Sequence, residues 1–545
     1  MTIMKQTFFA IALVFYATFC CKVNAQWTSD VSVNTPLTNS GKCGDQLSAT
    51  TSDGKTYILW GEEDFSSNYY SHFQLLDKFG NKMWEPNGII PFSRLYNVSD
   101  LTVDKFDNAV ILTDYYDSTS MNYKLAVFKL DTTGNQLWGS QGITLDGYIG
   151  TSIIVNNSNE VYVSSWEGSI WKIAANGTLL WTSPIHVPEP DTTTGRCKLI
   201  PNEDNGFTAL YVSISTPPVD GVLKTMRYDE NGNTKWVNDV QVSSYNTHSY
   251  QDFYYTSDGY NGFITAYTVI PNFHNGDAQK VDSAGNKLWG TDGVLISASV
   301  TKEIFVTGIE YLPSVKEFWI IAQQMNQGQN GSGTIVQNID SNGLQLLGNN
   351  GKELSPIDSN FSPGGIRNVN DGLIYFYYKI VGFSGDFIYQ IFAEKIDYVG
   401  NTLWKKTICS VSSYKYWGSS GPFKNNQIIF VWADSRNTNT SGDNDIFAQN
   451  INKDGNPGPA GIENPQTTKM DFDLYPNPAI DGVYIDCADR KGSKMQIFNI
   501  IGNRVFQSDL TSGTNVIDIS SLTTGIYVVR LTSADGIFQR KLIKN

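Results

Sequence analysis

The sequence predicts an all-β protein, an eight-bladed β-propeller that is closed by its own N-terminal strand and followed by a small β-sandwich. Three observations predict this fold class. First, a motif that joins a tight turn to a tryptophan recurs along most of the chain. Second, short alternating runs of Tyr, Phe, Val and Ile lie between the turns. Third, a spare copy of one strand precedes the first repeat. Aromatic residues make up 13% of the 545 residues and glycine contributes 48, which suits short strands joined by tight turns.

The recurring motif is Asp-x-x-Gly-Asn-x-Leu-Trp, which first occurs at Asp77–Trp84, with Met in place of Leu, and then at Asp131–Trp138. Asp-x-x-Gly predicts a type I turn that the Asp side chain caps, with glycine in the left-handed conformation. The tryptophan, four positions after the glycine, is expected to lie on the next strand and dock against a neighbouring unit. Copies return roughly every 55 residues, as in repeat architectures. The later copies centre on Gly177, Gly232, Gly285, Gly343, Gly400 and Gly455.

Each repeat carries enough strand-forming segments for one propeller blade. In the second repeat these segments are 98–106, 108–113 and 124–129, and the segment that holds the tryptophan supplies a fourth. Four strands in a unit of this length are typical of a blade. A solenoid of stacked repeats is the rival architecture.

The two ends of the repeat region favour the propeller. After the eighth turn, the segment 457–459 (Pro-Gly-Pro) is unsuited to a paired outer strand, because proline lacks the backbone donor. The missing strand is present at the start, where 26–31 (Gln-Trp-Thr-Ser-Asp-Val) aligns with 288–293 (Leu-Trp-Gly-Thr-Asp-Gly). The N-terminal segment, with Trp27, is therefore expected to complete the eighth blade and remove the exposed strand edges.

The body resembles the tryptophan-docking repeats of eight-bladed, quinoprotein-like propellers. It is still more similar to a class of secreted Bacteroidetes propellers that carry a Val-Trp-x-Asp-x-Arg strand followed by Asp-Ile-Tyr-Ala-Gln. These motifs occur here as Val431-Trp432-Ala-Asp434-Ser-Arg436 and Asp445-Ile-Phe-Ala-Gln449. The resemblance covers nearly all of residues 26–456, and it implies an architecture rather than an activity.

The N-terminus has the features of a secretory signal peptide. Lys5 precedes the apolar run 8–19, which is too short to span a bilayer. The run is followed by Val-Asn-Ala at 23–25, a small-residue pattern that predicts cleavage after Ala25. The mature chain is therefore expected to begin at Gln26, and residues 1–25 to be removed on export.

The C-terminal segment is expected to be a separate domain, residues 470–545, joined by a Pro- and Gly-rich linker, residues 457–469. It resembles the type A sorting domain of the type IX secretion system. The resemblance implies a Bacteroidetes source, export through the periplasm to the cell surface or medium, and the secretion machinery and a surface sortase as partners. It also implies that the tail is removed, after which the protein is released or anchored to a surface glycolipid. The sorting motif comprises Tyr475, Pro476, Asn477, Pro478, Gly525, Lys541 and Lys544.

Charge and motif content exclude several function classes. The net charge is −14 without a Lys/Arg-rich run, so nucleic acid is not an expected partner. No further segment is long and apolar enough for a transmembrane helix. Catalytic motifs of hydrolases, kinases and zinc proteases do not occur, and no cofactor or metal site is expected, although loop carboxylates leave calcium open. The expected mature chain has four cysteines, none with Cys-x-x-Cys spacing: Cys43, Cys197, Cys409 and Cys487. The sequence allows either a disulfide among them or separate buried thiols.

A candidate ligand surface follows from the blade topology. The first and third connections of each blade share one face and are tight turns, whereas the second connection and the link to the next blade share the other face and are long. Loops held by a rigid scaffold carry most binding sites. We therefore expect a non-catalytic module that binds glycan or protein on the long-loop face, or alternatively a polysaccharide hydrolase or lyase. The candidate ligand-binding residues are Asp64, Asp114, Trp166, Tyr416, Trp417 and Asp434.

Overall fold

The computed structural model contains two compact units, residues 1–460 and 461–545, called here the body and the tail. The predicted cleavage site between Ala25 and Gln26 and the candidate Asp64 lie outside the residues that the structure describes. The described residues are 27–63, 69–90, 97–188, 193–214, 220–248, 253–271, 273–438, 440, 442–458, 473–487, 494–499, 504–511, 513–533 and 536–545.

The described part of the body forms eight antiparallel sheets, one for each repeat, in which neighbouring strands follow chain order. Seven sheets have four strands, and the first has three named strands with a Phe73–Ile89 bridge beyond them. The strands, sheet by sheet, are β2 (Cys43–Thr50), β3 (Thr56–Glu63), β4 (Tyr69–Leu76); β5 (Asn97–Val103), β6 (Ala109–Asp117), β7 (Asn122–Leu130), β8 (Ile143–Leu145); β9 (Gly150–Val155), β10 (Val161–Ser165), β11 (Ser169–Ile173), β12 (Ile185–His186); β13 (Thr193–Pro201), β14 (Phe207–Ile214), β15 (Asp220–Tyr228), β16 (Val240–His248); β17 (Phe253–Ser257), β18 (Phe263–Val269), β19 (Asn275–Val281), β20 (Val294–Leu295); β21 (Lys302–Leu312), β22 (Glu317–Asn326), β23 (Ser332–Asp340), β24 (Lys352–Ser355); β25 (Phe361–Asn368), β26 (Leu373–Phe383), β27 (Phe387–Ile396), β28 (Thr402–Ser413); and β29 (Lys415–Ser420), β30 (Ile428–Asp434), β31 (Asp445–Ile451), β1 (Thr35–Pro36).

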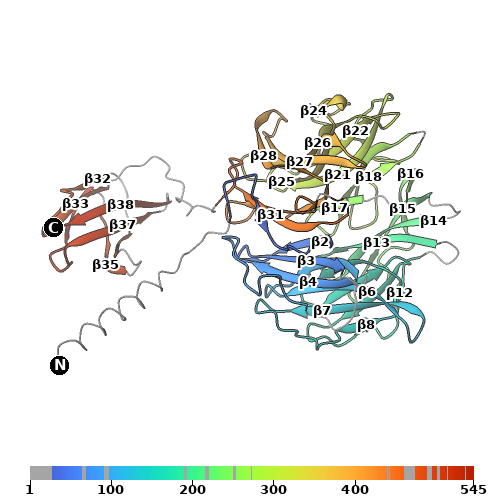
Figure 1. Cartoon of the computed structure of the whole chain (residues 1–545), viewed down its shortest axis with the longest axis horizontal. Helices are drawn as coiled ribbons and strands as arrows, with labels where there is room; N and C mark the ends of the chain where they lie inside the picture. The colour runs from blue at the N-terminus through green and yellow to red at the C-terminus, as the bar shows by residue number, and fades with distance from the viewer. Residues whose placement is uncertain are drawn as a thin grey trace. The chain divides into compact units, whose positions relative to one another are not determined.

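The first strands of the eight sheets contact one another in a closed sequence. Each first strand contacts the first strand of the next sheet, and β29 of the last sheet contacts β2 of the first. Figure 1 shows the blue β2 beside the orange β31, so the two ends of the body meet. Sheets arranged radially around a ring of inner strands are a β-propeller, and the body has this fold.

The N-terminal segment completes the last sheet, as the sequence predicts. Strand β1 pairs antiparallel with β31, with Thr35 opposite Ala448. Thr28 O accepts a hydrogen bond from Gln449 Nε2, and Trp27 shares a hydrophobic cluster with residues of β30 and β31. Pro457 forms an isolated bridge with Ile451 and belongs to no named strand of the described residues. The ring is therefore closed by pairing between the two ends of the body.

Tryptophans from one sheet cover the turn of the next sheet around the ring. A Cβ on the turn glycine would lie within 3.6 Å of the docked ring, as for Gly285 under Trp236 and Gly80 under Trp27. The indole N–H donates to the carbonyl two residues before that glycine; Trp236 donates to Ser283 O at 3.1 Å and Trp27 to Lys78 O at 3.2 Å. The same docking joins Trp84, Trp138, Trp181, Trp289 and Trp404 to Gly134, Gly177, Gly232, Gly343 and Gly455.

One detail of the repeat differs from the prediction. We expected the tryptophans on the outer strands, but Trp138 and Trp289 precede the outer strands of their sheets, which begin at Ile143 and Val294. The reason is a second turn after each tryptophan, in which Gly139 and Gly290 take positive φ. The tryptophan therefore lies between two turns of the chain, before the outer strand, and packs on the Asp-x-x-Gly turn of the adjacent sheet.

The tail comprises two antiparallel sheets around one hydrophobic core. Tyr475–Pro476 and Asn477–Pro478 are cis peptide bonds. In the part of the chain that the structure describes, no helix has the length and apolarity needed to cross a membrane. The sheets are formed by β32 (Asp473–Tyr475), β33 (Gly482–Cys487) and β36 (Gly513–Asp518), and by β35 (Arg504–Asp509), β34 (Lys494–Asn499), β37 (Gly525–Ser533) and β38 (Gly536–Lys544).

Candidate functional site on the long-loop face

Three cavities lined by described residues lie on the long-loop face, which carries the second connection of each sheet and the link to the next sheet. The tyrosine cavity, of about 620 Å³, lies between the second and third sheets, where the β6–β7 connection meets the β8–β9 link. The asparagine cavity, also of about 620 Å³, lies between the β22–β23 connection and the β24–β25 link. The Asp45 cavity, of about 530 Å³, lies where β2 begins, beside the β30–β31 connection.

Three exposed aromatic rings line the tyrosine cavity. Tyr116 and Tyr123 are directly opposite each other on β6 and β7, and Tyr148 comes from the β8–β9 link. Their side chains are 52%, 42% and 48% exposed. The rings of Tyr116 and Tyr123 meet edge to face at 5.4 Å, and those of Tyr123 and Tyr148 at 5.3 Å. Large apolar surfaces at such exposure mark binding sites more often than chance.

Charged groups stand at the edge of the tyrosine cavity. Lys124 Nζ lies 3.0 Å from Asp146 Oδ1. Glu167 Oε1 accepts a hydrogen bond from Tyr148 N at 2.9 Å, which fixes the carboxylate beside the rings. The lining therefore holds two carboxylates and one ammonium group, and it combines flat apolar surfaces with acceptors in the manner of ligand pockets.

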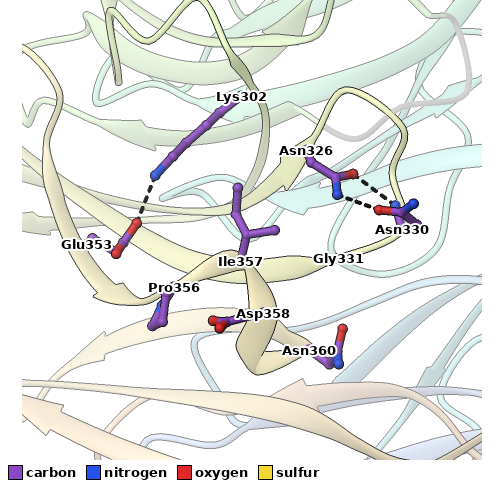
Figure 2. Close-up of a pocket in the computed structure, with 9 residues that line it drawn as sticks. All are labelled: Lys302, Asn326, Asn330, Gly331, Glu353, Pro356, Ile357, Asp358 and Asn360. Carbon is purple, nitrogen blue, oxygen red and sulfur yellow. Dashed lines mark hydrogen bonds and ion pairs between the residues drawn. The ribbon is translucent and has the colours of Figure 1, made fainter.

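The asparagine cavity, shown in Figure 2, is lined mainly by polar groups that already have partners. Lys302 Nζ lies 2.8 Å from Glu353 Oε2, and the side chains of Asn326 and Asn330 are hydrogen-bonded to each other. Ile357, from the short 3-10 helix η1 (Ile357–Ser359), stands between these two pairs in the view. The carboxylate of Asp358 projects from the same short helix.

The Asp45 cavity contains Tyr416, one of the residues selected from the sequence. Tyr416 Oη donates a hydrogen bond to Asp386 Oδ2 at 3.1 Å. The side chain of its neighbour Trp417 lies outside the described residues. Tyr416 therefore lies on the expected face, in a pocket between the first and the last sheets of the ring.

Two other selected residues lie close to the predicted face and line none of these three cavities. Asp114 is buried near the end of β6 and accepts hydrogen bonds from Asn97 Nδ2 and Ser99 Oγ. Burial raises the pKa of Asp114, and these two hydrogen bonds oppose the rise. Trp166 is half-buried, its backbone N–H donates to Ile149 O, and the next residue, Glu167, lines the tyrosine cavity.

Asp434 is the centre of a buried ion-pair network, so we leave it out of the proposed site. Its Oδ2 lies 2.9 Å from Lys415 Nζ and 2.6 Å from Arg436 Nη2, and Ser413 Oγ donates to Oδ1 at 2.6 Å. Burial opposes the charge, but Lys415 and Arg436 outweigh it and lower the pKa of Asp434 to about 2. Arg436 also donates to Val33 O, which ties the motif to the N-terminal segment.

The cysteines of the body are separate buried thiols. Cys43, Cys197 and Cys409 are all free, and each belongs to a different hydrophobic cluster. Burial raises the pKa of the Cys43 thiol to about 12, so it is a poor nucleophile. Among the described residues, no three His, Cys, Asp or Glu side chains are grouped so that they could hold a metal ion.

The three tyrosines are the candidate residues that sequence reasoning missed. Tyr116 and Tyr123 flank the β6–β7 connection, and an aromatic residue on each side of a hairpin tip was a readable signal. The position of Tyr148 beside these rings was harder to predict from the sequence, because it depends on how the link between two sheets folds back over the hairpin.

Some of the predicted sorting residues contact the last strand of the tail. Asn477 Nδ2 donates to Lys541 O at 2.6 Å, and Asn477 Oδ1 accepts from Ile543 N at 2.8 Å. Gly525 begins β37 opposite Lys544. Residues 473–545 match the family model described as secretion system C-terminal sorting domain. The tail is a sorting domain of this family. The sorting domain is of the Bacteroidetes type IX system, and it marks the protein for export to the cell surface or the extracellular space.

Other comparisons concern a short segment or the fold. An ulvan lyase, NLR42, from Nonlabens ulvanivorans is 34% identical over 74 residues. The match covers 13% of this chain and only 14% of the lyase. The structure is similar to the Dos1 propeller, with 13% identity over 77% of this chain and 97% of that chain and a TM-score of 0.43. It is also similar to the β-propeller domain of the Trilobed protease from Pyrococcus furiosus, with 9% identity over 68% and 99% of the two chains and a TM-score of 0.35.

Proposed function

We propose that this protein is a non-catalytic binding propeller that recognises a neutral glycan through its tyrosine cavity. The observation that carries the proposal is the exposed, edge-to-face arrangement of Tyr116, Tyr123 and Tyr148 around a cavity of about 620 Å³. Aromatic rings offer a flat apolar surface together with a polar hydroxyl, which matches the alternating C–H and O–H groups of a sugar ring.

The polar groups of the cavity favour an uncharged sugar. Glu167 and Asp146 are acceptors for sugar hydroxyl groups, and Lys124 is held by Asp146 at 3.0 Å. The net charge of the chain is −14, so its long-range field repels sulfated or uronic polysaccharides. Neutral oligosaccharides therefore fit the cavity better than anionic ones.

Export places this binding surface where such ligands occur. In this proposal, the surface sortase removes the sorting domain, and the body is then released or attached to a surface glycolipid. The rigid ring holds the β6–β7 connection and the β8–β9 link in place, so little conformational freedom is lost when a ligand binds.

A second candidate function is cleavage of a polysaccharide, and the short match to an ulvan lyase is the observation that favours it. A lyase acting on uronic sugars needs cationic groups to neutralise the sugar carboxylate. The tyrosine cavity offers Lys124 alone for this purpose, and Asp146 pairs with it. We therefore rank binding above cleavage.

The test is a glycan-array screen of the secreted protein, followed by titration calorimetry with the best neutral oligosaccharide. Tyr123→Ala removes the central ring and should raise Kd by about tenfold or more, because an aromatic contact is lost from a well-packed site. Tyr260→Ala is the matched control: this tyrosine is 71% exposed and belongs to a tight turn on the opposite face. Tyr260→Ala should change stability by less than about 0.5 kcal/mol, as is usual at exposed positions. Tyr123→Ala should cost about 1–3 kcal/mol because it removes two ring contacts, so binding is measured at a temperature where both variants are folded.

Equal losses of binding in the two variants, or none in Tyr123→Ala, would reject the tyrosine cavity as the site. The lyase alternative has its own readout: incubation with ulvan and other uronic polysaccharides should give no ultraviolet absorbance from unsaturated sugar ends. Appearance of that absorbance would establish the enzyme instead.

A further inference from the structure

The Asp45 cavity has features of a second, chemically different site. It lies at the start of the innermost strand β2 and is lined by residues of β2, β5, β29, β30 and the β30–β31 connection. Asp45 has a positive φ of 53° and sits in a bulge between Gly44 and Leu47. Bulges re-aim side chains and often lie next to functional sites. The carboxylate of Asp45 is exposed, and no ion pair or hydrogen bond joins it to a side chain among the residues that the structure describes.

A second unpaired acceptor lines the same cavity. Asn444 is only 6% exposed, and its Nδ2 donates to Gly442 O at 3.2 Å. Its Oδ1 is buried and has no hydrogen-bond partner among the described residues. Buried acceptors nearly always have a partner, so an unpaired one that lines a pocket is a place where a ligand donor is expected.

The remaining lining determines what kind of donor fits. Leu47, Val98 and Ala433 are apolar, and the lining residues include neither lysine nor arginine. Asp45 supplies a negative charge that no described cation pairs with, and the Nζ of the nearby Lys42 lies 3.6 Å from Asp443 Oδ1 instead. A ligand group that is positively charged and carries several N–H donors satisfies both Asp45 and Asn444 Oδ1.

We propose that the Asp45 cavity binds the protonated amino group of an amino sugar. The volume of about 530 Å³ accommodates a sugar ring with its ammonium group at the acceptors and its ring carbons against the apolar wall. A lysine side chain brings the same ammonium group on a narrow chain and leaves most of that volume unfilled. The site is separate from the tyrosine cavity, and the proposal does not depend on the proposed function.

The experiment is titration of the secreted protein with D-glucosamine, N-acetyl-D-glucosamine, D-glucose and L-lysine amide. D-Glucosamine should bind at least about tenfold more tightly than the other three, because only it combines the charge with the ring. Asp45→Asn should weaken glucosamine binding by about tenfold, and Asn444→Asp, which adds a second carboxylate, should strengthen it several-fold. Asp358→Asn, which removes an exposed carboxylate from another cavity on the same face, is the matched control and should change nothing.

Three results would overturn the proposal: equal affinity for glucosamine and its N-acetyl form, an undiminished affinity in Asp45→Asn, or lysine amide binding as tightly as glucosamine. Asp45 is exposed, so its variant should fold normally and stays informative even if Asn444→Asp is poorly folded. Tyr123→Ala should leave glucosamine binding unchanged. That result separates the failure of this proposal from failure of the tyrosine cavity.

Discussion

Among single residues, Asp434 shows how a buried charge makes stability depend on pH. Its pKa in the folded protein is about 2, below the ordinary value of 3.8. A lowered pKa means that the folded state binds fewer protons than the unfolded state between these values. The stabilisation is therefore complete above pH 4 and is lost as the pH falls toward 2.

We predict that Asp434→Asn destabilises the body by about 3–5 kcal/mol at neutral pH, because it leaves the ammonium group of Lys415 buried without its counter-charge. The difference from the natural protein should shrink as the pH is lowered from about 4 to 2, where the natural carboxylate is also neutralised. Denaturant unfolding at a series of pH values measures both effects. A difference that stays constant across this range would mean that Asp434 is not the titrating group.

The same residue shows where sequence reasoning fails for side chains. Asp434 stands just before a long connection, and its position in the sequence is indistinguishable from that of an exposed loop acidic residue. Its partner Lys415 is brought opposite it only by the register of β29 and β30. Burial by a partner from another strand depends on that register, which no local motif specifies.

Among structural elements, the docking of tryptophan on the turn of the next sheet is the repeated unit of stability. Gly285 has a φ of 89°, and a Cβ there would lie 3.0 Å from the ring of Trp236. Gly290 has a similar φ of 83°, but a Cβ there would meet no atom within 4 Å. An alanine at either position would be strained by the positive φ, but only an alanine at position 285 would also meet the ring of Trp236.

We predict that Gly290→Ala costs about 1–2 kcal/mol, the strain of a left-handed alanine, and that Gly285→Ala costs clearly more because it also displaces the indole. Equilibrium unfolding of both variants measures the difference. Equal costs would show that the glycine is needed for the turn alone and that the tryptophan contributes little.

The elements themselves were largely predictable, because each depends on local chemistry. Asp131, for example, accepts hydrogen bonds from Thr133 N and Asn135 N through one carboxylate oxygen, as the turn motif indicates. The bulge at Asp45 was not predictable. The register of β2 against β3 shifts between Gly44 and Leu47, and a change of register leaves no residue pattern in the sequence.

For the whole molecule, closure by the N-terminal segment is the decisive contact. Trp27 is 1% exposed and docks on the first sheet. In the same segment, Thr28 O accepts a hydrogen bond from Gln449 and Thr35 pairs with Ala448, both in the last sheet. The spare strand at the start and the prolines at the end predicted this arrangement, because an unpaired edge must be covered somewhere.

We predict that Trp27→Ala destabilises the entire body by about 3–5 kcal/mol, the usual cost of truncating a buried aromatic residue. Trp84→Ala is the matched control, since Trp84 makes the same contact between consecutive sheets. Hydrogen exchange should show that loss of Trp27 opens the first and last sheets together, whereas loss of Trp84 opens the first and second. Exchange confined to residues near position 27 would mean that the ring does not depend on this closure.

The pairing of the two ends has a consequence for the order of folding. Gln449 and Thr28, which the closing contact joins, are 421 positions apart in the sequence. A chain that crosses a membrane from its N-terminus exposes Trp27 first, but the strand that receives this segment arrives only after all seven preceding sheets. Loop closure over such a distance is slow compared with formation of each sheet from neighbouring segments. The pairing of the N-terminal segment with the last sheet is thus the last contact to form, and the ring stays open until the body has emerged to its final repeat.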